Sequence, residues 1–477
     1  GFQGQVALGG HAEARGWFGR GYSPQGELFQ FIGTRLGDID KTKTKAADDK
    51  DTAAKAPDIK PVAPVAITAL PLPFGAYGLD TPPKGEDLVL AGGTVWTSGS
   101  AGNIPNGAVW IRDGKIAWVG KASKLPEEIP SSTRRIDTTG KHLTPGLIDC
   151  HSHTGISRGI NESRQTITSE VRIGDVMNPD DIAWYRELAG GLTTVNQLHG
   201  SANPIGGQNH VAKIRWGSRH PDAMSLRGAP AGIKFALGEN PKRRGATKGD
   251  RYPSTRLGVA AIIRDRFVAA REYAAAHQRH AANPSATVAA PRRDLELDAL
   301  VEILDGKRLV HCHSYRQDEI LMLCRLADEF GFKLGTFQHA LEGYKVAEAI
   351  KKSALGASSF SDWWAYKFEV IDAIPYNGAI MHDVGVVVSF NSDSSELARR
   401  MNTEAGKAVK YGNLPPAEAL KFVTINPAIQ LGVEQRIGSL EKSKDADLAI
   451  WSGNPLSYRS RCEATYIDGC AYFTIER

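Results

Sequence analysis

The stretch Leu143–His153 reads LTPGLIDCHSH, an apolar run that ends in two histidines two positions apart. Side chains at positions i and i+2 of an extended strand point to the same side, so His151 and His153 face the same way. Two imidazoles at one end of a strand can hold one divalent metal ion between them. The stretch therefore predicts a metal site at the carboxyl end of a strand, at the mouth of a barrel.

Four more strand-like runs carry metal-binding side chains at or near their carboxyl ends. These side chains are Lys234 in GIKFAL, His311 and His313 in LVHCH, His339 in FQH, and Asp393 in SFNSD. Neutral imidazoles together with a carboxylate suit zinc or a similar divalent ion. Such an ion lowers the pKa of water bound to it, and a nearby carboxylate can move the proton. The pattern predicts one or two divalent metal ions, zinc before others, and hydrolytic chemistry.

Strand-like and helix-like segments alternate through the middle of the chain. The eight strand-like segments are 145–150, 192–198, 211–215, 232–237, 308–312, 335–339, 356–360 and 386–391. The helix-like segments are 180–190, 257–279, 295–304, 317–330, 344–353, 394–411 and 415–424. This alternation predicts an α/β fold of βαβ units, and eight parallel strands are what a (β/α)8 TIM-like barrel needs. We place the barrel at 145–432, with its active site at the carboxyl ends of the strands.

Short β-type runs flank the barrel segment on both sides. Before it lie 88–90, 108–111 and 116–119, with the hairpin signal Asp113-Gly114, and after it lie runs within 446–473. We expect residues 86–144 and 433–477 to form the two halves of one small composite β-sandwich domain.

Residues 1–85 differ in composition from the rest. They begin rich in glycine, pass through the low-complexity charged stretch 40–60, and carry six prolines between 61 and 83. Such a composition buries too little apolar area to offset the chain entropy. We expect an extended or disordered N-terminal arm, which either wraps a partner subunit or serves as a linker.

Composition narrows the functional classes. Hydrophobic content of 41%, charged content of 23% and a net charge of +5 are ordinary globular values, and no nucleic-acid motif stands out, so we expect no nucleic-acid partner. The sequence has no run of ~18 apolar residues, so we expect no membrane span. The chain begins with Gly1, typical of a processed N-terminus, which favours a periplasmic or secreted location over a cytoplasmic one.

In this order and spacing, the motifs resemble those of the amidohydrolase superfamily of metal-dependent hydrolases. Within this superfamily, the motifs are most similar to those of the branch that holds imidazolonepropionase-like and prolidase-like enzymes. The resemblance covers roughly residues 86–477 and rests on TPGLIDCHSH, GIKFALGENPK, LVHCHS, FQHA, SFNSD and the tail NPAIQLGVEQRIGSLEKSKDADLAIWSGNPL. It implies a metal-binding amidohydrolase on a TIM barrel, and an oligomer.

The resemblance also implies a role for each matching residue. His151 and His153 would bind the more buried metal, and His311 and His339 a second one. Asp393 would contact the first metal and the attacking water. A carboxylated Lys234 would bridge the two ions, because only the anionic carbamate is compatible with two dications.

Three assignments keep an alternative. His313 shares a strand face with His311, so it could replace His311 as the ligand or hydrogen-bond the substrate; we take His311 as the ligand. In a mononuclear site, Lys234 would instead be a cation that binds the substrate. His199, which follows the second strand, is expected to contact substrate, and the basic loop 239–256 could clamp a substrate carboxylate.

We expect the enzyme to hydrolyse an amide C–N bond in a small molecule. The candidate substrates are a dipeptide, which would make the activity peptidase-like, an N-acyl amino acid or a cyclic amide. The substrate could carry a carboxylate. Asp393 would act as general acid and base, with His313 and His199 at the substrate. The alternatives are a deaminase, a lactonase, or a non-catalytic assembly subunit. Deaminases of the superfamily typically carry a glutamate three residues after the fifth-strand histidine, where this chain has Ser314. We expect a homo-oligomer, or a subunit of a larger assembly formed through 1–85.

Overall fold

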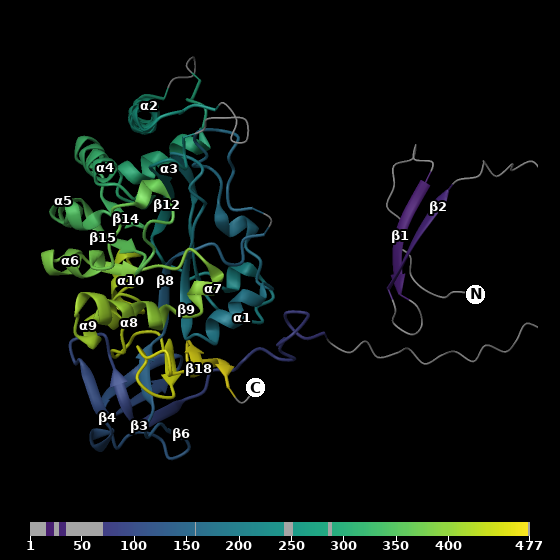
Figure 1. Ribbon diagram of the computed structural model, residues 1–477, viewed down its shortest axis with the longest axis vertical. Coiled ribbons are helices and arrows are strands. Elements are labelled where there is room, and N and C mark those ends of the chain that lie inside the picture. The colour runs from purple at the N-terminus through teal and green to yellow at the C-terminus, as the bar shows by residue number, and fades with distance from the viewer. Residues whose placement is uncertain are drawn as a thin grey trace, which may run out of the picture. The chain divides into compact units, whose positions relative to one another are not determined.

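The computed structural model describes residues 16–22, 28–34, 70–157, 159–242, 251–284 and 289–475 (Figure 1). The chain divides into two compact units, Gly1–Ile67 and Thr68–Arg477. Among the described residues, no helix has the length and apolar character that crossing a membrane requires.

The first unit contains a β-hairpin where the sequence predicted an extended or disordered arm. Strands β1 (Gly16–Tyr22) and β2 (Leu28–Thr34) pair in antiparallel register, with Gly16 opposite Thr34 and Tyr22 opposite Leu28. These residues are therefore extended, as one of the two predicted options has it, and they pair with each other. Aromatic and branched residues in GWFGRGY and LFQFIGT favour strands, which the glycine content obscured. The predicted charged stretch 40–60 lies outside the described residues.

The last part of the predicted arm, residues 70–85, belongs to the second unit and packs against its other residues. The Tyr77 ring stacks on Tyr185 with 4.3 Å between centroids, and the Trp216 indole nitrogen donates to the Tyr77 carbonyl at 2.8 Å. Leu72 and Leu79 exchange backbone hydrogen bonds of 2.9 and 2.7 Å, which close this segment into a loop. The boundary predicted at residue 85 is therefore too late, because aromatic contacts fix this proline-rich segment.

One eight-stranded sheet joins the two flanks of the central region. Its strands are β3 (Leu88–Trp96), β4 (Asn103–Arg112), β5 (Lys115–Lys121), β6 (Arg134–Asp137), β7 (His142–Pro145), β17 (Leu448–Trp451), β18 (Cys462–Ile467) and β19 (Cys470–Thr474). The order is β19-β18-β17-β7-β3-β4-β5, with β6 paired to β3. The β4–β5 turn has Asp113 and Gly114 at φ values of 50° and 72°, the left-handed backbone of a tight hairpin.

Two further sheets carry the strands that were predicted for the barrel. One has the order β10-β12-β13-β14-β15-β16, and the other has the order β11-β9-β8. Their strands are β8 (Leu147–Ser152), β9 (Leu192–Gln197), β10 (Ile205–Gln208), β11 (His210–Lys213), β12 (Ala231–Ala236), β13 (Arg308–His313), β14 (Leu334–Gln338), β15 (Ala354–Ser359) and β16 (Val388–Phe390). Strands β12 to β16 are parallel, as are β8 and β9.

The third predicted strand differs from a parallel βαβ unit. The segment 211–215 overlaps β11, which runs antiparallel to β9, and β10 runs antiparallel to β12. Residues 198–209 separate β9 from β11, but β10 takes up part of this connection, whereas a parallel crossover uses about a dozen or more residues, usually as a helix.

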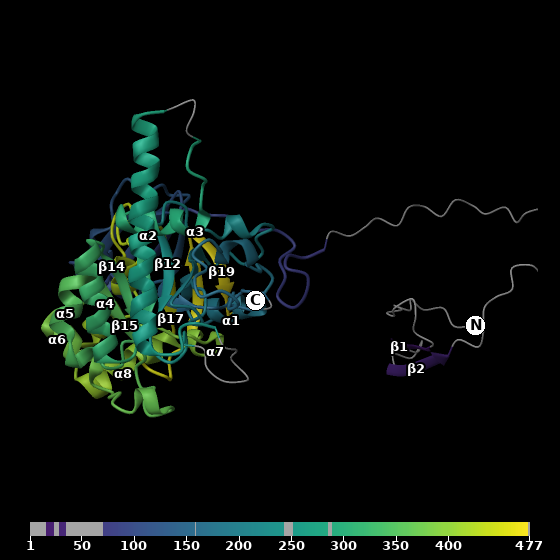
Figure 2. The ribbon, with the colours of Figure 1, turned by 90° about the horizontal axis from the view of Figure 1, so that it is seen from above.

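Helices follow most of the parallel strands and lie around the sheets (Figures 1 and 2). They are α1 (Ile182–Leu188), α2 (Arg256–Ala282), α3 (Leu295–Leu304), α4 (Gln317–Phe330), α5 (Ala347–Ser353), α6 (Asn377–Val384), α7 (Ser395–Ala398), α8 (Met401–Gly412), α9 (Pro416–Lys421) and α10 (Ile425–Gln430). The carboxyl-terminal part of α2 projects past its neighbours (Figure 2).

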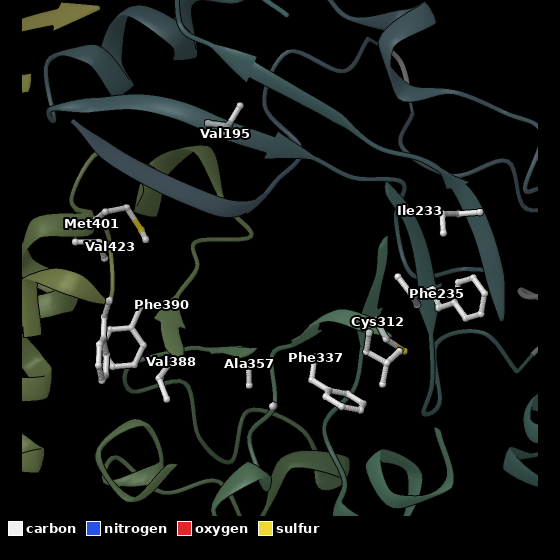
Figure 3. Close-up of a cluster of buried hydrophobic side chains, with 14 of the residues drawn as sticks. Val195, Ile233, Phe235, Cys312, Phe337, Ala357, Val388, Phe390, Met401 and Val423 are labelled. Carbon is white, nitrogen blue, oxygen red and sulfur yellow. The ribbon is translucent and has the colours of Figure 1, made fainter. Parts of the chain in front are cut away.

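The apolar core lies between these strands and helices (Figure 3). Phe235, Cys312 and Phe337 are fully buried members of it. Each is next in sequence to a polar strand residue that points to the opposite face, because side chains alternate along a strand. The alternation therefore anchors each strand to the helices while it directs Lys234 and His311 away from them.

Candidate active site

Three histidines surround the carboxylate of Asp393. Its Oδ1 lies 3.1 Å from His153 Nε2 and 3.6 Å from His151 Nε2, and its Oδ2 lies 3.6 Å from His339 Nε2. Ligand atoms of His151, His339 and Asp393 all lie within 4.8 Å of one another. The carboxyl ends of β8, β14 and β16 thus bring together groups that are about 240 residues apart in sequence.

Two of these residues have an unusual backbone conformation. His339 and Asp393 both have positive φ, at 58° and 49°, although neither is a glycine. Left-handed backbone at a non-glycine residue is uncommon and costs of order 1–3 kcal/mol. His339 directly follows β14, and Asp393 follows β16 after Asn391 and Ser392, so both lie where the chain turns at the carboxyl ends of the strands.

The protonation states of the histidines and of Asp393 favour the binding of a cation. Burial lowers the pKa of His339 to about 3, and burial followed by the positive charge of Lys234 lowers that of His151 well below its usual value. Burial raises the pKa of Asp393, but the hydrogen bond with His153 and the attraction of His339 outweigh it and bring the pKa to about 2. The site therefore offers neutral imidazoles and an ionised carboxylate at neutral pH.

The hydrogen bonds orient the rings for metal binding. His151 Nδ1 lies 3.3 Å from Gln338 Oε1, and His153 Nδ1 lies 2.8 Å from the Leu198 carbonyl oxygen. Amide and carbonyl oxygens only accept, so both Nδ1 atoms carry a hydrogen and His151 Nε2 keeps a lone pair. His153 Nε2 faces the Asp393 carboxylate at 3.1 Å, where a metal ion would replace its hydrogen. His339 Nε2 is buried and has no hydrogen-bond partner among the described residues. These residues fit a divalent ion such as zinc.

Lys234 belongs to the same cluster. Its Nζ lies 3.1 Å from His151 Nε2, and its side chain is buried. Burial lowers its pKa to about 8, against the opposing attraction of Asp393. A substantial fraction of this amine is therefore neutral near pH 8, as carboxylation of a lysine requires.

The two histidines of β13 lie at different positions along the strand, His311 within it and His313 at its carboxyl end. His311 pairs in register with Lys234 and Thr336, and its Nδ1 is 3.4 Å from the Thr336 hydroxyl. His313 is the last residue of the strand, and its ring centroid lies 5.2 Å from that of His339. His313 therefore lies near the ring of a candidate ligand, His339, while His311 stays the ligand that the sequence predicts.

His199, predicted to contact substrate, uses both ring nitrogens in hydrogen bonds to the main chain. Its Nε2 accepts from the Glu162 backbone N–H at 2.8 Å, and its Nδ1 lies 2.8 Å from the Gly200 carbonyl oxygen. Both ring nitrogens therefore bind the main chain, which gives this histidine a structural role; its predicted contact with substrate stays a prediction. This histidine holds the loop after β8 against the loop after β9.

The basic loop is also largely structural where it is described. Arg251 donates to the main-chain carbonyls of Ser163 at 2.8 Å and Ala202 at 2.7 Å, and Arg256 binds the Glu369 carboxylate at 2.8 Å. These guanidinium groups hold neighbouring loops together, contrary to the predicted carboxylate clamp. Residues 243–250 of the loop lie outside the described part of the chain.

Sequence reasoning missed the polar residues behind the ligands. Gln338, Ser358 and Asn391 are buried beside the histidines, and Ser392 donates to Asp149 at 2.5 Å. In the sequence, the only indication of these buried polar residues was the high polar content of the strand ends FQH and SFNSD.

Comparisons with known proteins agree with this site. The amidohydrolase family model matches residues 373–472. An amidohydrolase structure from Thermotoga maritima is 33% identical with a TM-score of 0.74, covering 81% of this chain and all of that one. The amidohydrolase tasK of Hapsidospora irregularis is 31% identical over 77% of this chain, which spans 40% of that protein's length. An imidazolonepropionase of Shewanella frigidimarina is 25% identical, over 74% of this chain and 88% of its own.

The chain belongs to the amidohydrolase family. It is a hydrolase that acts on carbon–nitrogen bonds, with a small molecule as its substrate. The family typically uses a divalent metal, and the group of His151, His339 and Asp393 fits one.

Proposed function

We propose that the enzyme hydrolyses the amide C–N bond of a small molecule, with a divalent ion held by His151, His153 and Asp393 and a second position served by His339, His311 and a carboxylated Lys234. The observation that carries the proposal is the convergence of three Nε2 atoms on the Asp393 carboxylate at 3.1–3.6 Å.

A bound divalent ion would supply a lowered pKa for water and polarisation of the scissile carbonyl. Asp393 accepts the proton of the attacking water at a carboxylate oxygen and returns it to the leaving nitrogen. Its low pKa keeps it ionised for the first of these steps. The buried imidazoles remain neutral, so they do not compete for that proton.

The sequence around β13 supports amide hydrolysis over deamination. Three residues after His311 stands Ser314, and three residues after His313 stands Arg316, so neither position offers the glutamate typical of deaminases. The resemblance to imidazolonepropionases adds a cyclic amide to dipeptides and N-acyl amino acids as candidate substrates.

We also infer that the two central sheets close into one (β/α)8 barrel over residues 145–432, with a composite β-sandwich at 86–144 and 433–477. The backbone N–H of Asp393, after β16, donates to the His151 carbonyl of β8 at 3.2 Å. On the other side, the Asn209 N–H between β10 and β11 donates to the Gly232 carbonyl of β12 at 3.1 Å. These bonds link the edges of the two sheets.

Metal removal tests the proposal. Elemental analysis of protein purified without chelator should find one or two divalent ions per chain, and dialysis against a chelator should abolish amide hydrolysis. Zinc or manganese should restore it, measured on a panel of dipeptides, N-acyl amino acids and cyclic amides. Undiminished turnover in the metal-free protein would contradict the proposal.

Lys234→Ala should reduce the metal content toward one ion per chain. Without the carbamate, no anion remains in this position to hold two dications together. Lys234→Glu supplies a carboxylate and should recover part of the second ion, which separates loss of charge from loss of packing. If Lys234 binds substrate as a cation instead, the metal content of the variant will equal that of the wild type and only KM will rise.

A further inference from the structure

A chain of buried polar side chains connects two of the candidate metal ligands. Gln338, Ser358 and Asn391 are each at most 1% exposed. Gln338 Oε1 lies 3.3 Å from His151 Nδ1 and 2.5 Å from Ser358 Oγ. As placed, Asn391 Oδ1 lies 2.8 Å from Ser358 Oγ, and Asn391 Nδ2 lies 3.0 Å from His339 Nδ1. The chain therefore runs without a gap from one imidazole to the other.

Counting hydrogens fixes the direction of each bond. The Gln338 amide nitrogen donates to the Cys150 carbonyl at 3.2 Å, so the Gln338 oxygen faces His151 and Ser358 as an acceptor. A serine hydroxyl has one hydrogen, and here it must go to that oxygen. Ser358 can then only accept from Asn391.

The Asn391 amide must therefore turn its nitrogen toward Ser358 and its oxygen toward His339. The amide oxygen and nitrogen have nearly the same shape, so a half-turn of the amide keeps the outline of the side chain, and hydrogen-bond partners decide between the two placements. The oxygen accepts from His339 Nδ1–H. His339 Nε2 then keeps its lone pair, in agreement with its buried position without a partner among the described residues.

We propose that Gln338, Ser358 and Asn391 form a polarised relay that sets His151 and His339 together in the tautomer with Nε2 free for metal. The inference rests on the proposed metal site and treats the three residues as positioning residues. If Asn391 were free to turn, its amide would donate to Nδ1, the hydrogen of His339 would move to Nε2, and the ligand atom would be blocked. Ser358 prevents this turn, so one hydroxyl controls ligands on two strands.

The tautomer can be observed directly in metal-free protein. Long-range proton–nitrogen NMR of histidine-labelled protein, assigned with His339→Gln, should show His339 with Nδ1 protonated and Nε2 bare. In Ser358→Ala the signal should shift toward a mixture of both tautomers. A wild-type His339 protonated at Nε2 would overturn the relay.

Metal affinity gives the second readout, by competition with a chromophoric chelator. Asn391→Leu and Ser358→Ala should each weaken binding about 10–100-fold, the usual effect of losing a partner behind a ligand. Asn391→Asp should bind the metal more tightly than Asn391→Leu, because its carboxylate still accepts from His339 Nδ1–H, although it cannot donate to Ser358. Ser359→Ala is the matched control: this serine is the next residue on β15, but its hydroxyl binds Asn377 and the Phe360 carbonyl.

The outcomes separate the two proposals. A wild-type protein that binds no divalent ion contradicts the proposed function. A wild-type protein that binds the ion, with Asn391→Asp as impaired as Asn391→Leu, contradicts the relay alone. Thermal unfolding of each variant shows whether a loss of affinity follows from a loss of fold.

Discussion

Asp393→Asn should lower kcat/KM by roughly 10⁴-fold, the upper end of what general acid–base catalysis contributes. The substitution preserves the size of the side chain but removes the charge and the basic oxygen. Asp393 is the point on which His151, His153 and His339 converge, so no other described carboxylate occupies its place. Steady-state kinetics on the metal-loaded enzyme would measure the change.

The metal content of the same variant separates the two roles of the carboxylate. If turnover is lost while the ion is retained, Asp393 acts mainly in proton transfer; if both are lost, it acts mainly as a ligand. Asp362→Asn is a suitable control, because this carboxylate lies on the loop after β15 and pairs with Lys407 at 3.0 Å. Full activity in Asp393→Asn would remove the residue from the mechanism.

The sequence predicted which residues gather at the site because strand ends are local features. A histidine or aspartate directly after an apolar run must lie at the carboxyl edge of a parallel sheet, where the ends of neighbouring strands meet. This placed His151, His153, His339 and Asp393 together before any geometry was known. The position of a strand end does not show how close each residue on one strand face lies to the other ligands. The choice between His311 and His313 therefore depends on the three-dimensional structure.

The structural roles of two other residues could not be predicted, for a different reason. His199 and Arg251 carry the same chemical groups as a catalytic histidine and a substrate-binding arginine, but their partners are main-chain atoms of other loops. Sequence patterns show side chains and not the backbone groups they bind. The same reason hid the relay, since Ser358 gains its role only from two amides on neighbouring strands.

The buried ion cluster around Lys213 was also invisible in the sequence, because its members are far apart along the chain. Lys213 Nζ lies 2.7 Å from Asp445, 2.9 Å from Asp447 and 2.6 Å from Asp468. The lysine belongs to β11, while the acids lie beside β17 and in the turn before β19. The cluster therefore joins the central sheets to the flanking sheet.

Lys213→Met should reduce the free energy of unfolding by about 3–5 kcal/mol, because removing one partner leaves buried carboxylates without compensation. The Lys213 side chain is fully buried, and those of Asp445 and Asp447 are 1% and 3% exposed. Denaturant unfolding followed by circular dichroism would measure the loss.

The stability of the variant should also respond less to acid. Burial raises the pKa of Asp445, but Lys213, Lys115 and Arg436 outweigh it and lower the pKa to about 2. A carboxylate with a depressed folded pKa contributes stability above its unfolded pKa of about 3.9, and this contribution is lost as the pH falls toward 2. Without Lys213 the depression is smaller, so the wild type should lose more stability than the variant over this range.

Lys115→Met is the matched control for this cluster. Lys115 also pairs with Asp445, but its side chain is 49% exposed, so water can replace it and the loss should stay below about 1 kcal/mol. Equal losses for the two lysines would mean that the contact itself, and not the burial of the charges, determines the stability. A Lys213→Met protein as stable as wild type would show that Arg436 and Lys115 compensate the three acids without it.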